Sequence, residues 1–445
     1  MFSVISVAES NSSCTRLNPR TLPRSELFVY NPAMHLVVFE SSHWSDLAPF
    51  TLTRPACLLR CGVTTLLEKH LHQLGAAANL RITLWTRKPL AAAAAREATN
   101  LIGLPIGVNE PLNDEPALLI DGATIANTDT PWPRLSGPWQ MSESGTLLAA
   151  MTVAPGLTSS DALEATDRWQ ALADLEPHAP ALRRIRHWGD LVSLNGTQFG
   201  PDLPRRLQWP TQPAASVATM NAHNVAIHAR ATLSPGVVLD ARNGPVFVDL
   251  GATIGANSVL EGPCYVGPHS RITPLSLIRG GTSIGPVCRV GGEVSNTIFQ
   301  GYSNKSHDGF LGDSVVGQWV NCGAGTTTSN LKSTYGPVKA TVGGRQLDTG
   351  RSLLGCAIGD HAKLATYTML AAGGYVGVGS MIATSGRAAR YTRSFRFVTD
   401  EGDAPLDPTK AAEIAERMHE RRDRHFDAIE AGVLDYARSA APAIE

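Results

Sequence analysis

The sequence predicts an α/β domain with a parallel sheet, followed by a parallel β-helix and a helix near the end of the chain. Two observations predict this fold. Strand-like and helix-like segments alternate between about residues 34 and 205, and from about residue 223 to 388 an aliphatic residue recurs at every sixth position. The 445 residues are enough for about two or three domains with sizeable cores.

We divide the chain into five parts. Residues 1–33 are rich in Ser and Asn, lack the apolar segment of a secretory signal and are expected to be a disordered extension. Residues 34–205 form the α/β domain, and the Pro-containing stretch 206–222 is expected to be a linker. Residues 223–390 form the β-helix, and residues 391–445 contain a tail and the last helix.

The α/β domain is predicted from short apolar runs separated by helical patterns. LVVF (36–39), RITLW (81–85) and PALLIDGATI (116–125) are typical of strands. TTLLEKHLHQLG (64–75) and PLAAAAAREATN (89–100) are typical of helices, the first closed by a glycine. Strands that alternate with helices indicate a parallel, Rossmann-like sheet.

The β-helix is predicted from the six-residue period, which no α-helix keeps because its own period is about 3.6. Three short strands make one coil of a triangular prism, and one aliphatic residue per strand points inward. Segments 295–310 and 324–341 break the phase, and segments that leave a solenoid often carry function. The in-phase residues are Ile254, Leu260, Val266, Ile272, Ile278, Ile284, Val290, Leu311, Val316, Cys322, Ile358, Leu364, Leu370, Val376 and Ile382.

The last helix is expected over about residues 407–440. Asp407 followed by Pro408 is typical of a helix start, and an apolar stripe follows it. We expect this stripe to pack against the body of the protein or a neighbouring subunit.

Composition excludes several classes of function. The chain has 38 Lys and Arg against 39 Asp and Glu, which argues against a general nucleic-acid-binding surface. No apolar run reaches the roughly 18 residues of a membrane span, so we expect no membrane partner. The seven cysteines form no CxxC pair, which favours reduced thiols in a cytoplasmic protein.

Residues 306–330, SHDGFLGDSVVGQWVNCGAGTTTSN, resemble the acetyltransferase domain of the bifunctional N-acetylglucosamine-1-phosphate uridylyltransferase/glucosamine-1-phosphate acetyltransferases. LAPFTLTRPACLLRCG (47–62) and HWGDLVSLN (187–195) are similar to a branch of sugar nucleotidyltransferases with the same architecture. The resemblance implies a nucleotidyltransferase-like α/β domain, a left-handed β-helix and a homotrimer with sites between subunits.

The resemblance also implies an acetyl-CoA-dependent site. His307 matches the general base that accepts a proton from the attacking amine, and Asn330 matches a residue that contacts donor and amino sugar. Gly323, Ala324 and Gly325 match the segment that meets acetyl-CoA.

The residues expected to bind the acyl acceptor differ from those of the family. Phe310 stands where those enzymes have Tyr, and their phosphate-gripping lysine pair falls near Ser295 and Asn296. Lys332 and Lys339 are the nearest candidates to hold a sugar phosphate. The acceptor, an amino sugar phosphate or a nucleotide amino sugar, therefore need not be glucosamine 1-phosphate.

The nucleotidyltransferase site is only partly present. The loop after the first strand, in LVVFESSHWSDLAPFTLTRP (36–55), contains no glycine to cradle a triphosphate. Arg54 and Arg60 remain as candidates to meet phosphate. Asp121 and Asn195 match the family's magnesium ligands, so Mg²⁺ is expected if this domain is active.

Three hypotheses follow. The first is an acetyl-CoA-dependent N-acetyltransferase joined to a nucleotidyltransferase-like domain that is active, binds without chemistry or is degenerate. The second is a sugar-1-phosphate nucleotidyltransferase whose β-helix serves only trimerisation. The third is a non-catalytic sensing or scaffold protein.

Overall fold

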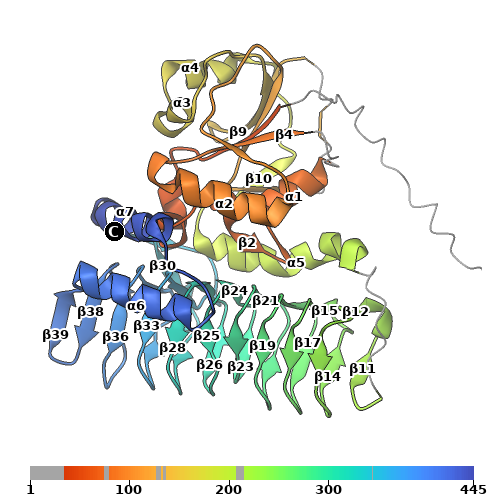
Figure 1. Ribbon diagram of the computed structural model, residues 1–445, viewed down its shortest axis with the longest axis vertical. Coiled ribbons are helices and arrows are strands. Elements are labelled where there is room, and N and C mark those ends of the chain that lie inside the picture. Colours follow the sequence, from red (N-terminus) through yellow and green to blue (C-terminus); the bar gives the residue numbers. More distant parts are fainter. Residues whose placement is uncertain (1–34, 75–79, 127–131, 134–136, 207–214, 343) are drawn as a thin grey trace, which may run out of the picture.

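The computed structural model describes residues 35–74, 80–126, 132–133, 137–206, 215–342 and 344–445. The predicted extension 1–33 and the glycine predicted to close the first helix lie outside these residues. The α/β domain lies along the side of the β-helix, and the two last helices lie against both (Figure 1).

The α/β domain contains a mixed sheet of six strands in the order β5-β4-β1-β6-β9-β8. The first four strands in that order are parallel, as predicted, and β9 and β8 add an antiparallel edge. The bounds are β5 (Gly107–Val108), β4 (Arg81–Trp85), β1 (His35–Phe39), β6 (Ala117–Asp121), β9 (Thr146–Thr152) and β8 (Trp139–Glu143). Two further pairs are β2 (Arg60–Cys61) with β3 (Thr64–Thr65), and β7 (Thr124–Ala126) with β10 (Leu182–Arg184).

The helices of this domain follow local signals in the sequence. Thr65 caps α1 (Leu66–Gln73) in a reciprocal capping box with Glu68, which satisfies free amides at the helix start. Gly103 closes α2 (Ala91–Ile102) in the left-handed conformation. The remaining helices are α3 (Ser159–Glu164), α4 (Asp167–Gln170) and α5 (Trp188–Arg206).

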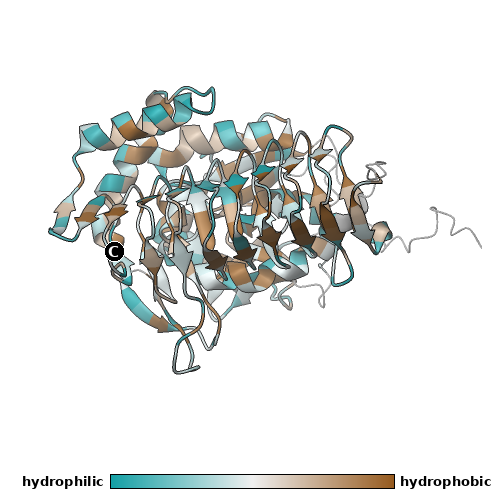
Figure 2. Ribbon diagram, turned by 90° about the horizontal axis from the view of Figure 1, so that it is seen from below, coloured by the Kyte–Doolittle hydropathy of each residue, from teal (hydrophilic) through white to brown (hydrophobic). Residues whose placement is uncertain are grey.

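The β-helix is built from three sheets in which each strand pairs in parallel with the strand one coil later; the last strand of the third sheet, β39, instead pairs antiparallel with β38. The predicted in-phase residues form one buried core inside the prism. Figure 2 shows hydrophobic residues recurring along successive coils. The first sheet contains β11 (Ala218–Met220), β14 (Val238–Asp240), β17 (Val259–Glu261), β20 (Leu277–Ile278), β23 (Glu293–Ser295) and β26 (Phe310–Gly312).

The other two sheets are longer. The second contains β12 (Val225–Ile227), β15 (Val246–Val248), β18 (Cys264–Val266), β21 (Thr282–Ile284), β24 (Ile298–Gly301), β27 (Val315–Gln318), β32 (Cys356–Ile358), β35 (Gly374–Val376) and β37 (Tyr391–Thr392). The third contains β13 (Thr232–Leu233), β16 (Thr253–Ile254), β19 (Arg271–Ile272), β22 (Arg289–Val290), β25 (Asn304–Lys305), β28 (Asn321–Cys322), β33 (Lys363–Leu364), β36 (Met381–Ala383), β38 (Arg396–Thr399) and β39 (Gly402–Pro405).

The two phase breaks have different structures. Across 295–310 the chain stays in the prism, because β24 and β25 pair with strands of the preceding coil. The coil that contains β24 and β25 is only shortened. After β29 (Thr327–Thr328), which pairs with β34 (Met369–Leu370), the chain leaves the prism. It forms the hairpin β30 (Lys339–Val342) and β31 (Arg345–Asp348). The first strand, β11, lies inside the stretch predicted to be a linker.

The C-terminal segment forms two helices rather than the single predicted helix. Asp407 caps α6 (Pro408–Glu420) as expected, with Pro408 in its first turn. A second capping residue, Asp427, accepts hydrogen bonds from the amides of Ile429 and Glu430 and starts α7 (Ala428–Ile444). Because Asp427 caps a new helix start at this point, the segment forms two helices instead of one.

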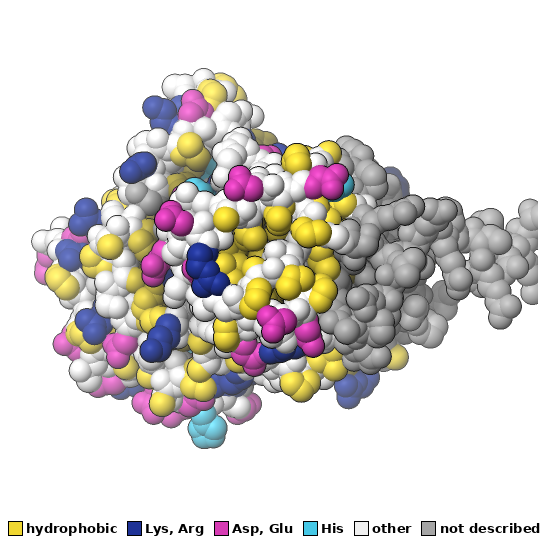
Figure 3. All heavy atoms as spheres, turned by 90° about the horizontal axis from the view of Figure 1, so that it is seen from above, with side chains coloured by type: hydrophobic (Ala, Val, Ile, Leu, Met, Phe, Trp, Pro, Cys, Tyr) yellow, Lys and Arg dark blue, Asp and Glu magenta, His cyan; other side chains and the backbone are white. Residues whose placement is uncertain are grey.

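The two domains share a hydrophobic core. Ile298, Val315 and Ala357 point outward from the β-helix and pack with Trp188 and Leu191 of α5. Both faces of these strands are therefore buried, which fixes the α/β domain on the solenoid. On the face seen in Figure 3, basic and acidic side chains are interspersed, in keeping with the near balance of charge.

None of the described helices is both long enough and apolar enough to cross a membrane. The six cysteines within the described ranges are free and buried, as the prediction of reduced thiols requires.

Candidate acetyltransferase site and the nucleotidyltransferase-like edge

His307 lies on an exposed corner between β25 and β26. The corner is held from inside the prism by Lys305, which is 2% exposed and pairs in register with Val290. Its Nζ donates to the carbonyls of His307 at 2.6 Å and Gly291 at 3.0 Å. A buried ammonium therefore positions the backbone of the predicted base, while the imidazole itself stays accessible.

Asn330 is linked to the same region through Asp313. Nδ2 of Asn330 donates to Oδ2 of Asp313 at 2.6 Å, and Nδ2 of Asn296 donates to Oδ1 of Asp313 at 2.7 Å. Asp313 is 7% exposed, so this carboxylate fixes two amides from neighbouring coils. The side chain of Asn330 thus retains a second N–H and its Oδ1 oxygen for hydrogen bonds to a ligand.

Gly323, Ala324 and Gly325 follow β28 at a corner beside the His307 loop. The amide of Gly325 donates to the carbonyl of Asp308 at 3.2 Å, and the carbonyl of Ala324 accepts from the amide of Tyr367 at 2.7 Å. Gly325 has φ of 72°, and a Cβ there would lie 2.5 Å from the Tyr367 ring. Glycine is required at this corner, and its backbone joins the histidine loop to the next coil.

Phe310 and Asn330 lie on either side of Gly312. A Cβ on Gly312 would meet the Phe310 ring at 2.4 Å and Nδ2 of Asn330 at 3.0 Å. Phe310 therefore lies beside Asn330, where it adds an apolar surface and no hydroxyl.

The two candidate phosphate-binding lysines are placed differently. Nζ of Lys332 donates to the carbonyl of Pro337 at 3.0 Å, so it braces its own loop. Lys339 is exposed on β30, in the hairpin that leaves the prism. The structure gives neither lysine a position beside His307.

Lys305 and Asp313 were not predicted from the sequence to be functional, and neither was the hydrogen bond from Asn296 to Asp313. A signal was available, because Asn296, Asp313 and Asn330 are each 17 residues apart. That spacing is one coil, so side chains at this interval stack on one another.

The carboxyl edge of the α/β sheet, where ligands bind in open α/β folds, is filled by protein. Glu40, directly after β1, forms an ion pair with Arg87, which follows β4, at 2.8 Å. The Arg87 guanidinium also lies 3.6 Å from the centre of the Trp44 ring and donates to Tyr436 of α7 at 3.2 Å. A buried ion pair and a helix therefore occupy the edge that a nucleotide would use.

Asp121 ends β6 at this same edge and is completely buried. Burial raises the pKa of its carboxyl to about 6, although the Ala123 amide and the Ser41 hydroxyl oppose this shift. Within the described residues, no group of three or more His, Cys, Asp or Glu side chains is arranged to hold a metal ion.

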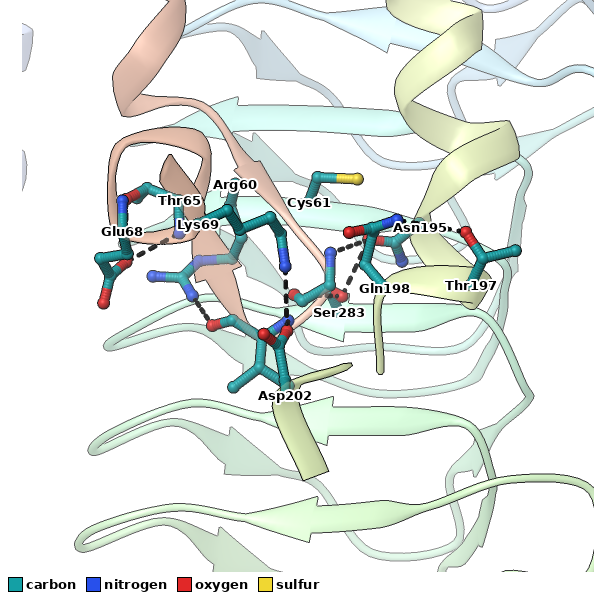
Figure 4. A network of polar contacts seen from close by, with 12 residues as sticks. Arg60, Cys61, Thr65, Glu68, Lys69, Asn195, Thr197, Gln198, Asp202 and Ser283 are labelled. Carbon is teal, nitrogen blue, oxygen red and sulfur yellow. Dashed lines mark hydrogen bonds and ion pairs between the residues drawn. The ribbon is translucent and has the colours of Figure 1, made fainter. Parts of the chain in front are cut away.

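Asn195 lies elsewhere, in the contact between the two domains (Figure 4). Its Oδ1 accepts from the amide of Gly62 at 2.6 Å, and its Nδ2 donates to the carbonyl of Gly281 at 2.6 Å. The hydroxyl of Ser283 lies 3.1 Å from Oδ1 and 2.7 Å from the carbonyl of Gly62, so its single proton serves these two acceptors. The prediction of Asn195 as a magnesium ligand therefore does not fit this arrangement, in which the side chain joins α5 to the β-helix.

Arg54 and Arg60 also lie at the domain contact. Arg54 forms a buried ion pair with Asp360 of the β-helix, and Thr53 donates to the same carboxylate oxygen at 2.8 Å. Nη1 of Arg60 donates to the carbonyl of Val63. The backbone carbonyl of Arg54 accepts a hydrogen bond of 3.4 Å from Nη2 of Arg87, so this segment borders the carboxyl edge, while the Arg54 guanidinium pairs with the β-helix.

These features define the class: a nucleotidyltransferase-type α/β domain joined to a hexapeptide β-helix. Residues 36–207 match the family model described as sugar nucleotidyl transferase. The chain is 30% identical over 209 residues to a bifunctional GlmU protein of Trichormus variabilis, covering 37% of this chain and 46% of that protein. These matches confirm the resemblance to GlmU-like proteins that the sequence predicts.

Two further relatives are similar over shorter stretches. A bifunctional GlmU protein of Acaryochloris marina is 32% identical over 136 residues, covering 26% of this chain and 30% of that protein. A bifunctional sugar-1-phosphate nucleotidylyltransferase/acetyltransferase of Sulfurisphaera tokodaii is 34% identical over 97 residues, covering 22% and 23%. The chain thus spans less than half the length of these curated relatives.

Among solved structures, the UDP-N-acetylglucosamine acyltransferase of Francisella novicida is similar over 47% of this chain and 90% of that chain. The sequence identity is 14% and the TM-score is 0.19. A likeness this distant carries no argument about function.

Proposed function

We propose that the protein is a transferase whose β-helix transfers an acetyl group from acetyl-CoA to the amine of an amino sugar phosphate or nucleotide amino sugar. His307 is the general base in this proposal. The observation that supports it most is that three predicted parts lie along one face of the solenoid, on either side of β26. The exposed His307 corner and the Gly323–Gly325 corner that hydrogen-bonds to it lie before β26 and β29, and Asn330, fixed by Asp313, lies at the corner after them.

The proposed chemistry assigns one task to each part. The imidazole accepts the proton that the amine loses as its nitrogen attacks the thioester carbon, and the thiolate of CoA leaves. Asn330 orients the reactants through the N–H and carbonyl that Asp313 leaves free. The backbone at Ala324 contacts the acetyl-CoA arm, as in the family that the sequence resembles.

The proposed site is open on one side. Tyr335 and Tyr367 are 76% and 75% exposed, and Tyr367 lies directly beside Gly325. In the family that the sequence resembles, the acetyltransferase sites lie between subunits, and the exposed Tyr367 ring is a surface that a neighbouring subunit would cover. We therefore include in the proposal a homotrimer in which a neighbouring subunit closes the site, to be checked by light scattering of the purified protein.

The nucleotidyltransferase-like domain is proposed to be inactive, because Glu40, Arg87 and α7 fill its carboxyl edge. The alternative is a nucleotidyltransferase with a purely trimerising β-helix, which the match of residues 36–207 to the sugar nucleotidyl transferase model supports.

The test is release of the CoA thiol from acetyl-CoA with a panel of amino sugars, their 1-phosphates and nucleotide amino sugars. His307→Ala should lower the rate by about 10²–10⁴-fold, the usual contribution of a general base. His269→Ala is the matched control, since His269 is also an exposed histidine at a β-helix corner. Equal activity of His307→Ala and wild type would contradict the role of His307. Absence of release with every acceptor would contradict the proposed activity.

A further inference from the structure

A second cavity lies where the α/β domain, the β-helix and the C-terminal helices meet. Its volume is about 440 Å³, within the range of small-molecule sites. Its walls come from the Arg54–Arg60 segment and α2, from a β-helix corner at Tyr302 and Trp319, and from α6 and α7. Glu40, Arg87, Asp121, His307 and Asn330 do not line it. Arg54 in its wall accepts a hydrogen bond from Arg87 through its backbone carbonyl, so the cavity borders the carboxyl edge without containing the Glu40–Arg87 pair.

Arg60 places a buried positive charge in this cavity. The residue is 7% exposed, and its Nε has no hydrogen-bond partner. No carboxylate forms an ion pair with it in the part of the chain that the structure describes. A buried cation is costly unless an anion or several acceptors compensate it. Among those residues the Arg60 guanidinium has one acceptor, the carbonyl of Val63, and lies 5.7 Å from the centre of the Tyr265 ring.

Arg54 adds unused donors in the same wall. One of its terminal nitrogens is engaged by Asp360, but Nε and Nη1 are buried without partners. Nδ1 of His361, also in the wall, has no partner either. Buried polar groups in native proteins are nearly always hydrogen-bonded, so several unused nitrogens around one cavity indicate a missing partner rich in oxygen acceptors.

The carboxylates of the wall do not supply that partner. Asp360 is committed to Thr53, Arg54 and the amide of Gln318. Glu430 lies 3.2 Å from Arg96 and 3.3 Å from His419. The third carboxyl, Glu97, accepts from Nε2 of Gln318 at 3.5 Å; burial raises its pKa, and the charges of Arg54 and Arg60 oppose this shift. Nη1 of Arg54 and Nε of Arg60 still have no partner among the described residues.

The rest of the wall suits an uncharged ring. Tyr302 stacks on Trp319 with ring centres 4.5 Å apart, and His419 of α6 stacks on Trp319 at 3.8 Å. Leu58, Leu101 and Leu434 add apolar surface. A site with arginines at one end and an aromatic and aliphatic wall beside them is the pattern that binds a phosphoryl group attached to a heterocycle or sugar.

We propose that this junction cavity binds a phosphorylated small molecule of nucleotide size, with Arg54 and Arg60 holding the phosphoryl oxygens. Because its walls belong to all three parts of the protein, the ligand stabilises their association. This site operates whether or not the β-helix transfers acetyl groups.

The test is titration calorimetry on the full chain, without acetyl-CoA or magnesium. The probes are inorganic pyrophosphate and the 5′-monophosphates of adenosine, guanosine, cytidine and uridine. Binding of at least one probe should weaken about tenfold or more in Arg60→Gln, which loses a charge-assisted contact. Asn100→Trp, a change at an exposed position on the cavity rim, should block binding without touching the buried arginines.

Arg279→Gln is the control, because Arg279 is ion-paired with Glu293 on the β-helix surface away from this cavity. Binding that is unchanged in Asn100→Trp would place the anion elsewhere and overturn the proposal. The lack of binding of every probe to the wild-type protein at millimolar concentrations would also overturn it. Since no acetyl donor is present, failure here is distinguishable from failure of the acetyltransferase assay.

Discussion

Asp313 accepts a hydrogen bond of 2.6 Å from Asn330, and the same carboxylate accepts another from Asn296 one coil earlier. Asp313 thereby fixes the side chain of a residue proposed to contact both substrates. It is a positioning residue in this account, since it acts through Asn330.

Asp313→Asn should lower acetyl transfer without unfolding the protein. Asn tolerates the left-handed backbone at this position, where φ is 48°, but it loses the charge of the acceptor. Weakening a charge-assisted hydrogen bond costs about 1.5–3 kcal/mol at most, which is roughly tenfold to a hundredfold in rate. The KM for the acceptor and kcat would be measured from CoA release. An unchanged kcat/KM would show that acetyl transfer does not require Asp313 to position Asn330.

Lys305→Met should reduce acetyl transfer by about tenfold while leaving the fold intact. Methionine fills a similar volume inside the prism and removes a buried charge, but the His307 carbonyl loses its 2.6 Å donor. Burial lowers the pKa of this lysine, which is consistent with the cost of keeping it charged there. Circular dichroism and CoA release would be compared in the same preparation.

Lys363→Met provides the control for this change. Lys363 makes an equivalent pair of bonds, 3.0 Å to the Trp319 carbonyl and 2.6 Å to the His361 carbonyl, at another corner. Its replacement should leave acetyl transfer unchanged. Equal loss in both variants would mean that the effect belongs to the solenoid and not to the His307 corner.

Asp121→Asn should make stability less dependent on pH. The folded-state pKa of Asp121 is raised from 3.8 to about 6, so the native state binds the proton more tightly than the unfolded chain. Stability from this group is therefore present below about pH 4, falls as pH rises through about 6 and is absent above it. The variant should gain up to about 3 kcal/mol at neutral pH.

Urea unfolding from about pH 4 to about pH 8 measures this dependence. Asp114→Asn, a change on the exposed surface, serves as control. A wild-type profile with the same slope as the Asp121→Asn profile would mean that Asp121 is not the titrating group.

No nucleotidyl transfer is expected from the α/β domain. With nucleoside triphosphates, sugar 1-phosphates and Mg²⁺, pyrophosphate release should stay at background, because the Glu40–Arg87 pair occupies the carboxyl edge. Magnesium should likewise leave the unfolding temperature unchanged. Steady pyrophosphate release that depends on a sugar 1-phosphate would contradict this expectation and would require Arg87 to move.

The six-residue period was sufficient to predict the solenoid and its core, because no other regular structure buries residues such as Ile254, Leu260 and Val266 at that interval. It was not sufficient to predict side chains that meet across coils, such as Asp313 with Asn330. Those contacts depend on the length of each coil, and the coil that contains Lys305 is shortened.

The α/β domain was harder to interpret from sequence for another reason. The resemblance assigned Asn195 to magnesium and Arg54 to phosphate, and it gave no sign that both side chains also form contacts with the β-helix. Such contacts join residues far apart in sequence, 306 positions for Arg54 and Asp360, and local patterns carry no information about them. The break between α6 and α7 was missed because Asp427 was not recognised as a second cap.

The α/β domain packs against the side of the β-helix, and this contact restricts where coils can be gained or lost in evolution. Solenoids ordinarily gain or lose whole repeats at little cost, since each coil contacts only its neighbours. Here α5 and the β2 strand pack against β21, β24 and β27, so one extra coil inserted among them would move part of the contact surface out of register. We therefore expect the number of coils to vary among relatives only outside the stretch that the α/β domain covers.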